Sequence, residues 1–162
     1  MSSDVSVSSS TRNAYGLDWV LNLEFEMTYE VLREPPRLED YMRLRRVSGL
    51  SGFSEDGARK GLAATLFGVS ILHEGETVGM GRLIGDGGCF FQVVDIAVDP
   101  EHQGKGLGKQ IIAALNQFID EIKERPIYVS LIADVPANKL YEQFGFKETA
   151  PGSIGMARSL RS

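Results

Sequence analysis

The stretch CFFQVVDIAVDPEHQGKGLGKQIIAALNQF, residues 89–118, decides the fold. It opens with an apolar, β-branched run from Phe90 to Val98, which predicts a buried strand that ends before Pro100. A glycine-rich loop follows, and apolar residues then recur at helical spacing as far as Ile119. This order of strand, glycine loop and helix is typical of anion-binding sites. Glycines let the backbone approach a ligand closely, and the first amides of a helix have no partners inside it.

The charges beside this loop indicate a phosphate group as the ligand. Lys105 and Lys109 flank the expected helix start, where the helix dipole already favours negative charge. The loop is not a Walker loop, because Gln110 stands where a hydroxyl residue would hold magnesium. It is not the dinucleotide fingerprint either, because Lys109 occupies the position of the third glycine. The missing hydroxyl speaks against a nucleotide hydrolase.

The remaining pattern is Gln103-x-x-Gly106-x-Gly108, between a strand and an amphipathic helix. It resembles the acetyl-CoA loop of the GNAT superfamily of N-acetyltransferases, whose pattern is Arg/Gln-x-x-Gly-x-Gly/Ala. The resemblance implies acetyl-CoA as the co-substrate and no metal ion. The residues that would bind the coenzyme A diphosphate are Gln103, Gly104, Lys105, Gly106, Leu107, Gly108 and Lys109.

A second motif, Asn138, Tyr141 and Gly145-Phe146, resembles another signature of the same family. Asn138 and Tyr141 are three residues apart, so they project from one side of a helix. The resemblance implies that Asn138 binds the pantetheine arm and that the Tyr141 hydroxyl protonates the leaving thiolate. A phenol with a pKa of about 10 is suited to that step.

The resemblance also predicts where pantetheine lies. In the family it adds as a strand to a gap between two parallel strands, here Val93–Val98 and Tyr128–Ala133. The backbone of Ile96, Ala97 and Val98 is expected to pair with it. A strand amide near Ile96 is expected to meet the oxyanion.

The whole chain can be read as one α/β (α+β) domain, residues 21–162, after a serine-rich tail, residues 1–20, that we expect to be flexible. The expected fold is the GNAT fold, with a mixed, mostly antiparallel sheet of about six or seven strands, splayed between the fourth and fifth, and about four helices. The expected strands are 25–33, 66–73, 77–84, 89–98, 127–133, 146–149 and 154–160. The expected helices are 38–47, a second that starts after the N-cap Ser54 and ends at about 62 or 64, 106–123 and 137–144.

Asp95 is the first candidate for the carboxylate that accepts the proton of the acceptor amine. It interrupts an apolar strand, and a buried charge is costly unless it is paired or functional. Strict alternation would place it on one face with Phe91, Val93 and Ala97. The alternative interpretation is a carboxylate that pairs with an arginine or caps a backbone group. Asp134 is the second candidate and Glu55 the third.

The acceptor is expected to be a primary amine of a small molecule, arylalkylamine or polyamine-like, attacked in a ternary complex. Aromatic side chains and carboxylates suit an amine with an apolar body. The expected wall contains Phe53, Phe90, Phe91 and Gln92, with Asp95 and Asp134 deeper. A protein or peptide amine stays open as acceptor, and so does a non-catalytic module that only binds acyl-CoA.

Composition limits the other partners. The net charge of −5 and the pI of about 5.1 argue against nucleic-acid binding. The sequence has no apolar run of about 20 residues and no secretory signal, so we expect no membrane contact and a cytoplasmic location. The single cysteine, Cys89, is expected to be buried and inert. A homodimer is compatible with the sequence.

Overall fold

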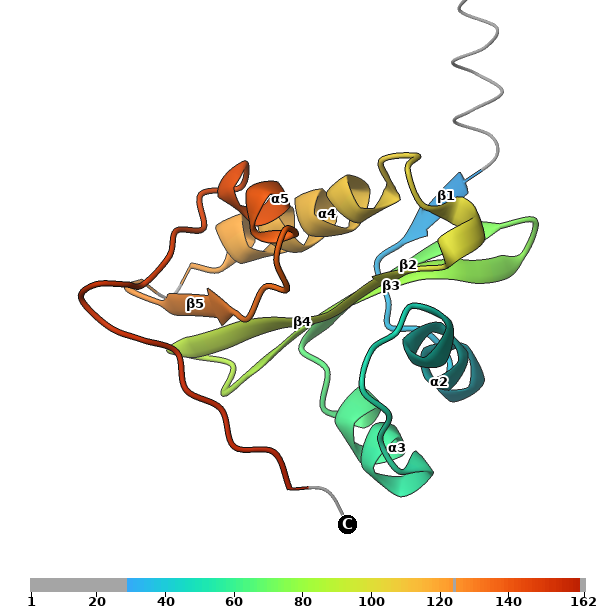
Figure 1. Ribbon diagram of the computed structural model, residues 1–162, viewed down its shortest axis with the longest axis horizontal. Coiled ribbons are helices and arrows are strands. Elements are labelled where there is room, and N and C mark those ends of the chain that lie inside the picture. The colour runs from blue at the N-terminus through green and yellow to red at the C-terminus, as the bar shows by residue number, and fades with distance from the viewer. Residues whose placement is uncertain (1–28, 124, 161–162) are drawn as a thin grey trace, which may run out of the picture.

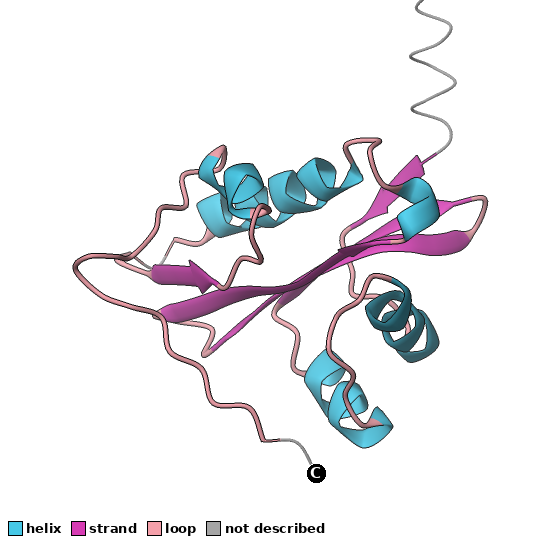
Figure 2. Cartoon of the chain, viewed as in Figure 1, coloured by secondary structure: helices cyan, strands magenta, loops and turns pink. Residues whose placement is uncertain are grey.

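The structure, a computed structural model, describes residues 29–123 and 125–160 and consists of one sheet between two helical layers (Figure 1). Helices α4 and α5 cover one face of the sheet, and α2 and α3 cover the other, as Figure 2 also shows. The strands are β1 (Tyr29–Leu32), β2 (Phe67–His73), β3 (Glu76–Gly85), β4 (Phe90–Val98) and β5 (Tyr128–Leu131). The helices are α2 (Leu38–Val47), α3 (Glu55–Ala63), α4 (Leu107–Glu121) and α5 (Asn138–Glu142), with a 3₁₀ turn, η1 (Pro100–His102).

The sheet has the order β1-β2-β3-β4-β5, antiparallel as far as β4. Strand β5 then pairs with β4 in parallel, from Phe90 opposite Tyr128 to Val93 opposite Leu131. The chain reaches β5 by crossing over through α4. This arrangement confirms the mixed α/β fold. The pairing with β5 stops at Val93 although β4 continues to Val98, so the two strands part where the splay was predicted.

Helix α4 packs closely on the sheet. Its buried side chains, Ile111, Ile112 and Leu115 among them, recur at helical spacing, as the sequence predicted. Gly81 of β3 lies directly beneath, where a Cβ atom would stand 2.4 Å from Cγ2 of Ile111. Any side chain at position 81 would push the helix away, so this glycine fixes the distance between α4 and the strands that hold the site.

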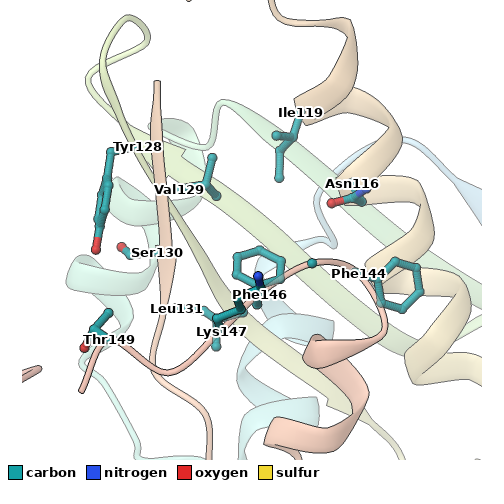
Figure 3. Close-up of a pocket in the computed structure, with 11 residues that line it drawn as sticks. Asn116, Ile119, Tyr128, Val129, Ser130, Leu131, Phe144, Phe146, Lys147 and Thr149 are labelled. Carbon is teal, nitrogen blue, oxygen red and sulfur yellow. The ribbon is translucent and has the colours of Figure 1, made fainter. Parts of the chain in front are cut away.

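The expected hairpin of 146–149 and 154–160 is wrong: neither segment forms a strand. The Ser153 amide donates to the Thr149 carbonyl at 2.9 Å and closes a turn, after which the chain runs away from β5 (Figure 1). Residues 146–149 pass beside β5 without pairing, and a pocket of about 390 Å³ stays open between them (Figure 3). A segment without a partner cannot form a ladder. The described sheet therefore has five strands.

Two further expectations concern the ends of the chain. The tail, residues 1–20, and residues 25–28 of the first expected strand lie outside the described residues. Within 29–123 and 125–160, no helix is both long and apolar enough to cross a bilayer.

Cys89 is exposed, so the expectation of a buried cysteine is wrong. It lies in the turn before β4, where its amide donates to Oδ1 of Asp86 at 2.8 Å. The strand pattern was extended one residue too far, because β4 begins at Phe90. Because Cys89 lies in the turn, its side chain does not belong to the buried face of the sheet.

Candidate functional site

The glycine loop leads from β4 into α4 and leaves its backbone uncovered. Gly104 and Gly106 have left-handed backbone angles, with φ of 75° and 78°. Gly106 is the N-cap of α4. A Cβ atom at either position would have nothing within 4 Å. The loop therefore presents open space in front of the first amides of α4, those of Leu107 and Gly108, which have no partners inside the helix.

The side chains around this loop are mainly basic. Lys105 donates from Nζ to the Tyr29 hydroxyl at 3.0 Å, and Tyr29 is hydrogen-bonded to Nδ1 of His102 at 2.9 Å. His102 is thus held by a neighbouring tyrosine. Lys109, in the first turn of α4, is exposed. The predicted diphosphate residues therefore lie together at one helix end, with two lysines beside it.

The edge of β4 next to the gap holds Ile96, Ala97 and Val98. Because β5 ends at Leu131, β3 is the strand partner of this part of β4. The Val98 carbonyl accepts the side-chain amide of Gln103 at 3.0 Å, which ties the loop to the strand end. The gap starts just beyond the Val93–Leu131 pair, and a chain carrying amides could add there as an extra strand.

Asp95 is the bulged residue of β4. Its φ is 58°, and the register shifts so that Asp95 and Ile96 together face Gly81 of β3. A non-glycine residue with positive φ is uncommon and favours Asp and Asn. The bulge reverses which residues point to each face. The expectation that Asp95 shares a face with Phe91 and Val93 is therefore wrong.

Phe91 is only 4% exposed and packs in the core under α4. Its side chain points away from the face that carries Asp95, although the residue also lines the groove beside α3, so its place in the acceptor wall stays a prediction. Phe90 and Gln92, one residue to either side, point to the opposite face, the one covered by α2 and α3.

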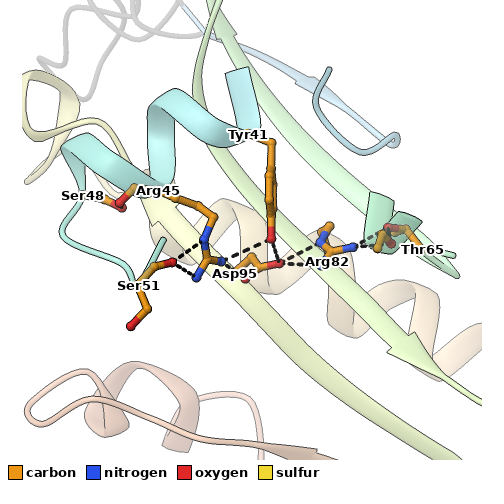
Figure 4. Close-up of polar contacts among 8 residues, drawn as sticks. Tyr41, Arg45, Ser48, Ser51, Thr65, Arg82 and Asp95 are labelled. Atoms are coloured by element: carbon orange, nitrogen blue, oxygen red, sulfur yellow. Dashed lines mark hydrogen bonds and ion pairs between the residues drawn. The ribbon is translucent and has the colours of Figure 1, made fainter. Parts of the chain in front are cut away.

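The Asp95 carboxylate is bound by two arginines and a tyrosine (Figure 4). Arg45 pairs with Oδ1, and Arg82 donates from Nε to Oδ2 at 2.8 Å. The Tyr41 hydroxyl donates to Oδ2 at 3.1 Å. The side chains of Arg45, Arg82 and Asp95 are 7%, 8% and 10% exposed. Burial, and next the Asp95 charge, raise the pKa of the Tyr41 phenol, which keeps it a donor.

This cluster connects the bulge to the segment between α2 and α3. Arg45 donates from Nε to the Ser51 carbonyl at 2.8 Å, and its guanidinium carbon lies 4.3 Å from the ring centre of Phe53. Phe53 is 57% exposed, as the predicted acceptor wall requires. Arg82 reaches the other way and donates to the Gly61 carbonyl at 2.8 Å. Asp95 thus has the paired environment that was its alternative interpretation.

Sequence reasoning did not assign Tyr41, Arg45 or Arg82 to the site. The signal was present, since Arg45 continues the apolar stripe of α2 and Arg82 interrupts an apolar strand. A charged residue at a core position indicates a buried partner. The partner could have been identified only with the bulge, which turns Asp95 toward these arginines.

Asn138 and Tyr141 line a pocket of about 350 Å³. Leu131, the last residue of β5, and the two residues after it line the same pocket. Tyr141 also packs against the core on the α4 side. Its burial, followed by the charge of Asp134, raises the pKa of the Tyr141 phenol. Asn138 donates to Oε1 of Glu142 at 3.2 Å. The predicted acid therefore approaches the gap from the α4 and α5 side, opposite to Asp95.

The other two candidate carboxylates are exposed. Asp134 follows β5 and is close enough to Tyr141 to affect its ionisation. Glu55 is on the first turn of α3 and pairs with Arg59 at 2.6 Å. Glu55 is therefore part of an i,i+4 pair on the helix surface.

A groove of about 580 Å³ lies on the α3 side of the sheet, along β4 and β5. Tyr128 and Ser130 of β5 point into it, whereas Val129 points from the other side of the strand toward α4 (Figure 3). Gln92 and Ser130 are paired one residue before the two strands part. The inner end of the groove therefore reaches the gap. Its full lining is Gly61, Ala64, Arg82, Ile84, Gly85, Asp86, Phe90, Phe91, Gln92, Tyr128 and Ser130.

Residues 65–148 match the family described as an acetyltransferase (GNAT) domain. The match runs from just before β2 to just beyond α5, so it includes the bulge, the glycine loop and Tyr141. The structure resembles the crystal structure of a probable acetyltransferase from meticillin-resistant Staphylococcus aureus. The two have 43% sequence identity and a TM-score of 0.77, over 82% of this chain and 99% of that chain.

Two curated proteins are similar over shorter stretches. GCN5-related N-acetyltransferase 2, chloroplastic, of Arabidopsis thaliana is 34% identical over 84 residues, 51% of this chain and 31% of the plant protein. The spermine/spermidine N(1)-acetyltransferase of Bacillus subtilis (strain 168) is 42% identical over 52 residues, 31% of this chain and 34% of that protein. The chain spans about a third of the length of these relatives.

Proposed function

The chain belongs to the GNAT family of acetyltransferases, and from this premise we propose that it transfers an acetyl group from acetyl-CoA to a primary amine of a small molecule. The observation that carries the proposal is the gap between β4 and β5, which begins beyond the Val93–Leu131 pair. The glycine loop adjoins one end of β4, and Tyr141 follows the end of β5. A carrier with a diphosphate and an amide-bearing arm matches both features.

In the proposed complex the diphosphate lies at the start of α4. The backbone amides of Leu107 and Gly108 face it, and Lys105 and Lys109 supply positive charge. Because Gly104 and Gly106 have open space around them, the phosphates can approach the main chain directly. Acetyl-CoA supplies the thioester when bound.

The pantetheine arm would then lie along the gap, hydrogen-bonded to the free edge of β4 at Ile96 and Ala97. Asn138, at the start of α5, would bind the same arm from the other wall. Asn138 and Tyr141 line one pocket, which supports a shared role in holding the end of the carrier.

The acceptor would approach from the opposite face, through the groove beside α3. Its neutral nitrogen attacks the thioester carbon, forms the C–N bond and breaks the C–S bond. A main-chain amide at the bulge, near Ile96, faces the oxyanion. Tyr141 gives its proton to the leaving sulfur and regains one from the new ammonium through water. Because burial keeps the phenol protonated, Tyr141 suits the acid role.

We assign Asp95 a positioning role, since both of its oxygens already accept hydrogen bonds from arginines or Tyr41. Asp134 is the better candidate for the proton acceptor. Its carboxylate is exposed and lies near Tyr141. Phe53 and Phe90, both exposed, support an acceptor with an apolar body.

The proposal is tested by release of free thiol from acetyl-CoA with a panel of arylalkylamines, polyamines and peptide amines. Turnover with small amines is the expected result. Turnover with peptides alone would move the acceptor class to proteins. Tight coenzyme A binding without turnover on any amine would leave a binding module and end the enzymatic proposal. The homodimer stays a prediction, for which light scattering is the measurement.

A further inference from the structure

The groove beside α3 has an outer end, away from the gap between β4 and β5, that is lined by two aromatic side chains and a carboxylate. Phe90 and Tyr128 are paired across β4 and β5, with ring centres 6.2 Å apart. They are 63% and 53% exposed, although both are large and aromatic. Asp86, the first residue of the turn between β3 and β4, lines the same groove. Two exposed rings beside a carboxylate suit an organic cation, because the ring faces and the acid both attract positive charge.

Asp86 is held in a fixed position. Its Oδ1 atom accepts the amides of Gly88, Cys89 and Phe90 at 2.9, 2.8 and 3.0 Å. All three bonds go to the same carboxylate oxygen. They also hold the pKa of the Asp86 carboxyl below its ordinary value, so it is ionised at neutral pH.

The positive charge that also lines the groove is already engaged. Arg82 is 6% exposed. Its guanidinium donates to Asp95, to the Gly61 carbonyl and to the Thr65 hydroxyl. The charge of Arg82 is therefore neutralised by Asp95. The outer end of the groove takes its negative charge from Asp86.

We propose that Asp86, Phe90 and Tyr128 form an outer subsite that binds the distal ammonium of an elongated diamine or polyamine, while its near amine reacts at the gap. This inference rests on the proposed function and narrows its substrate class. Asp86 lies beside Phe90, since its amide donates to the Phe90 carbonyl at 3.1 Å. Phe90 is four residues before Val94, where β4 and β5 have parted. At the usual rise of a strand this is about 13 Å, a span that suits an extended chain.

The test compares α,ω-diamines with n-alkylamines of the same length, as the ratio of their kcat/KM values. Asp86→Asn is the informative variant, because its side-chain oxygen can still accept the three turn amides. We expect the ratio to fall about fivefold in this variant, as expected for loss of an exposed ion pair. The loss should shrink at high salt. Asp120→Asn, the same charge change on the far side of the sheet on α4, should leave the ratio unchanged.

The aromatic half of the subsite has its own variant. Phe90→Leu keeps an apolar side chain without a π face, and the ratio should fall about threefold. An unchanged ratio in Asp86→Asn, with amines still acetylated, would overturn the subsite and leave the proposed function intact. If no amine is acetylated, the subsite is tested by binding instead. Calorimetry then measures the affinity of the diamine for the protein with coenzyme A present. Equal affinity in the wild type and in Asp86→Asn would again overturn the subsite.

Discussion

Arg82 donates from Nε to Oδ2 of Asp95 across 2.8 Å, which joins β3 to the bulged residue of β4. The bulge turns Asp95 toward the α2 face, and the arginine holds it there. The same carboxylate binds Arg45, whose guanidinium also binds Ser51 in the segment that leads to Phe53. One buried carboxylate thus connects the strand edge proposed for the thioester with a wall proposed for the acceptor.

Removing this charge should destabilise the protein strongly. Asp95→Asn keeps a residue type that tolerates positive φ but leaves two buried guanidinium groups without their anion. We expect the free energy of unfolding to fall by about 3–5 kcal/mol, measured by denaturant titration. Asp95→Gly also removes the charge, but it relieves any backbone strain, because glycine adopts φ of 58° freely. If Asp95→Gly proved as stable as the wild type, the ion pairs would not be what stabilises the bulge.

Arg45→Lys tests whether the fork geometry positions the acceptor wall. Lysine keeps the charge but cannot bind Asp95 and the Ser51 carbonyl in the same way or stack on Phe53. We expect KM for the amine to rise about tenfold while the Kd of coenzyme A stays constant. Arg46→Lys is the matched control, because Arg46 is the next residue on α2 and is exposed. Equal losses of amine and coenzyme A binding would instead indicate general unfolding.

The sequence predicted those parts of the fold that depend on local patterns. The glycine loop, the apolar stripe of α4 and the bounds of α2 follow from spacing within a few residues, and the structure agrees. The side chains that face the acceptor were harder to predict. Alternation assigns Phe91 and Asp95 to one side, and a single bulged residue reverses that assignment. The failed hairpin after Gly145 has the same kind of cause, since a strand depends on a partner that its own residues do not reveal.

Tyr141→Phe tests the proposed acid. It removes only the hydroxyl, so we expect kcat to fall by a factor of about 10²–10⁴ with little change in the Kd of coenzyme A. The pH dependence provides a second readout. The pKa of Tyr141 is raised above the ordinary 10.0, so the donating form persists to higher pH. The midpoint of any activity loss caused by its ionisation should therefore lie above pH 10 in the wild type, and this loss should be missing in the variant. Full activity in Tyr141→Phe would assign thiolate protonation to another group.

Asp134→Asn tests the proposed proton acceptor. If the Asp134 carboxylate accepts the amine proton through water, kcat/KM should fall by a factor of about 10²–10⁴. Because Asp134 is exposed, the free energy of unfolding should stay within about 0.5 kcal/mol of the wild type. Glu142→Gln, a charge change in the pocket that Tyr141 lines, is the control. An unchanged kcat/KM in Asp134→Asn would indicate that the amine loses its proton to solvent.

Gly108→Val tests cofactor binding at the glycine loop. The family pattern accepts glycine or alanine at this position, so a larger side chain is needed to keep the diphosphate from the backbone. We expect the Kd of coenzyme A to increase about tenfold in Gly108→Val, or about 1.4 kcal/mol, by calorimetry. Gly108→Ala is the matched control. A Cβ atom there meets only Cδ2 of Leu140, at 3.6 Å, and alanine favours a helix over glycine, so both the fold and the Kd should be preserved. Unimpaired binding in Gly108→Val would mean that the diphosphate lies elsewhere.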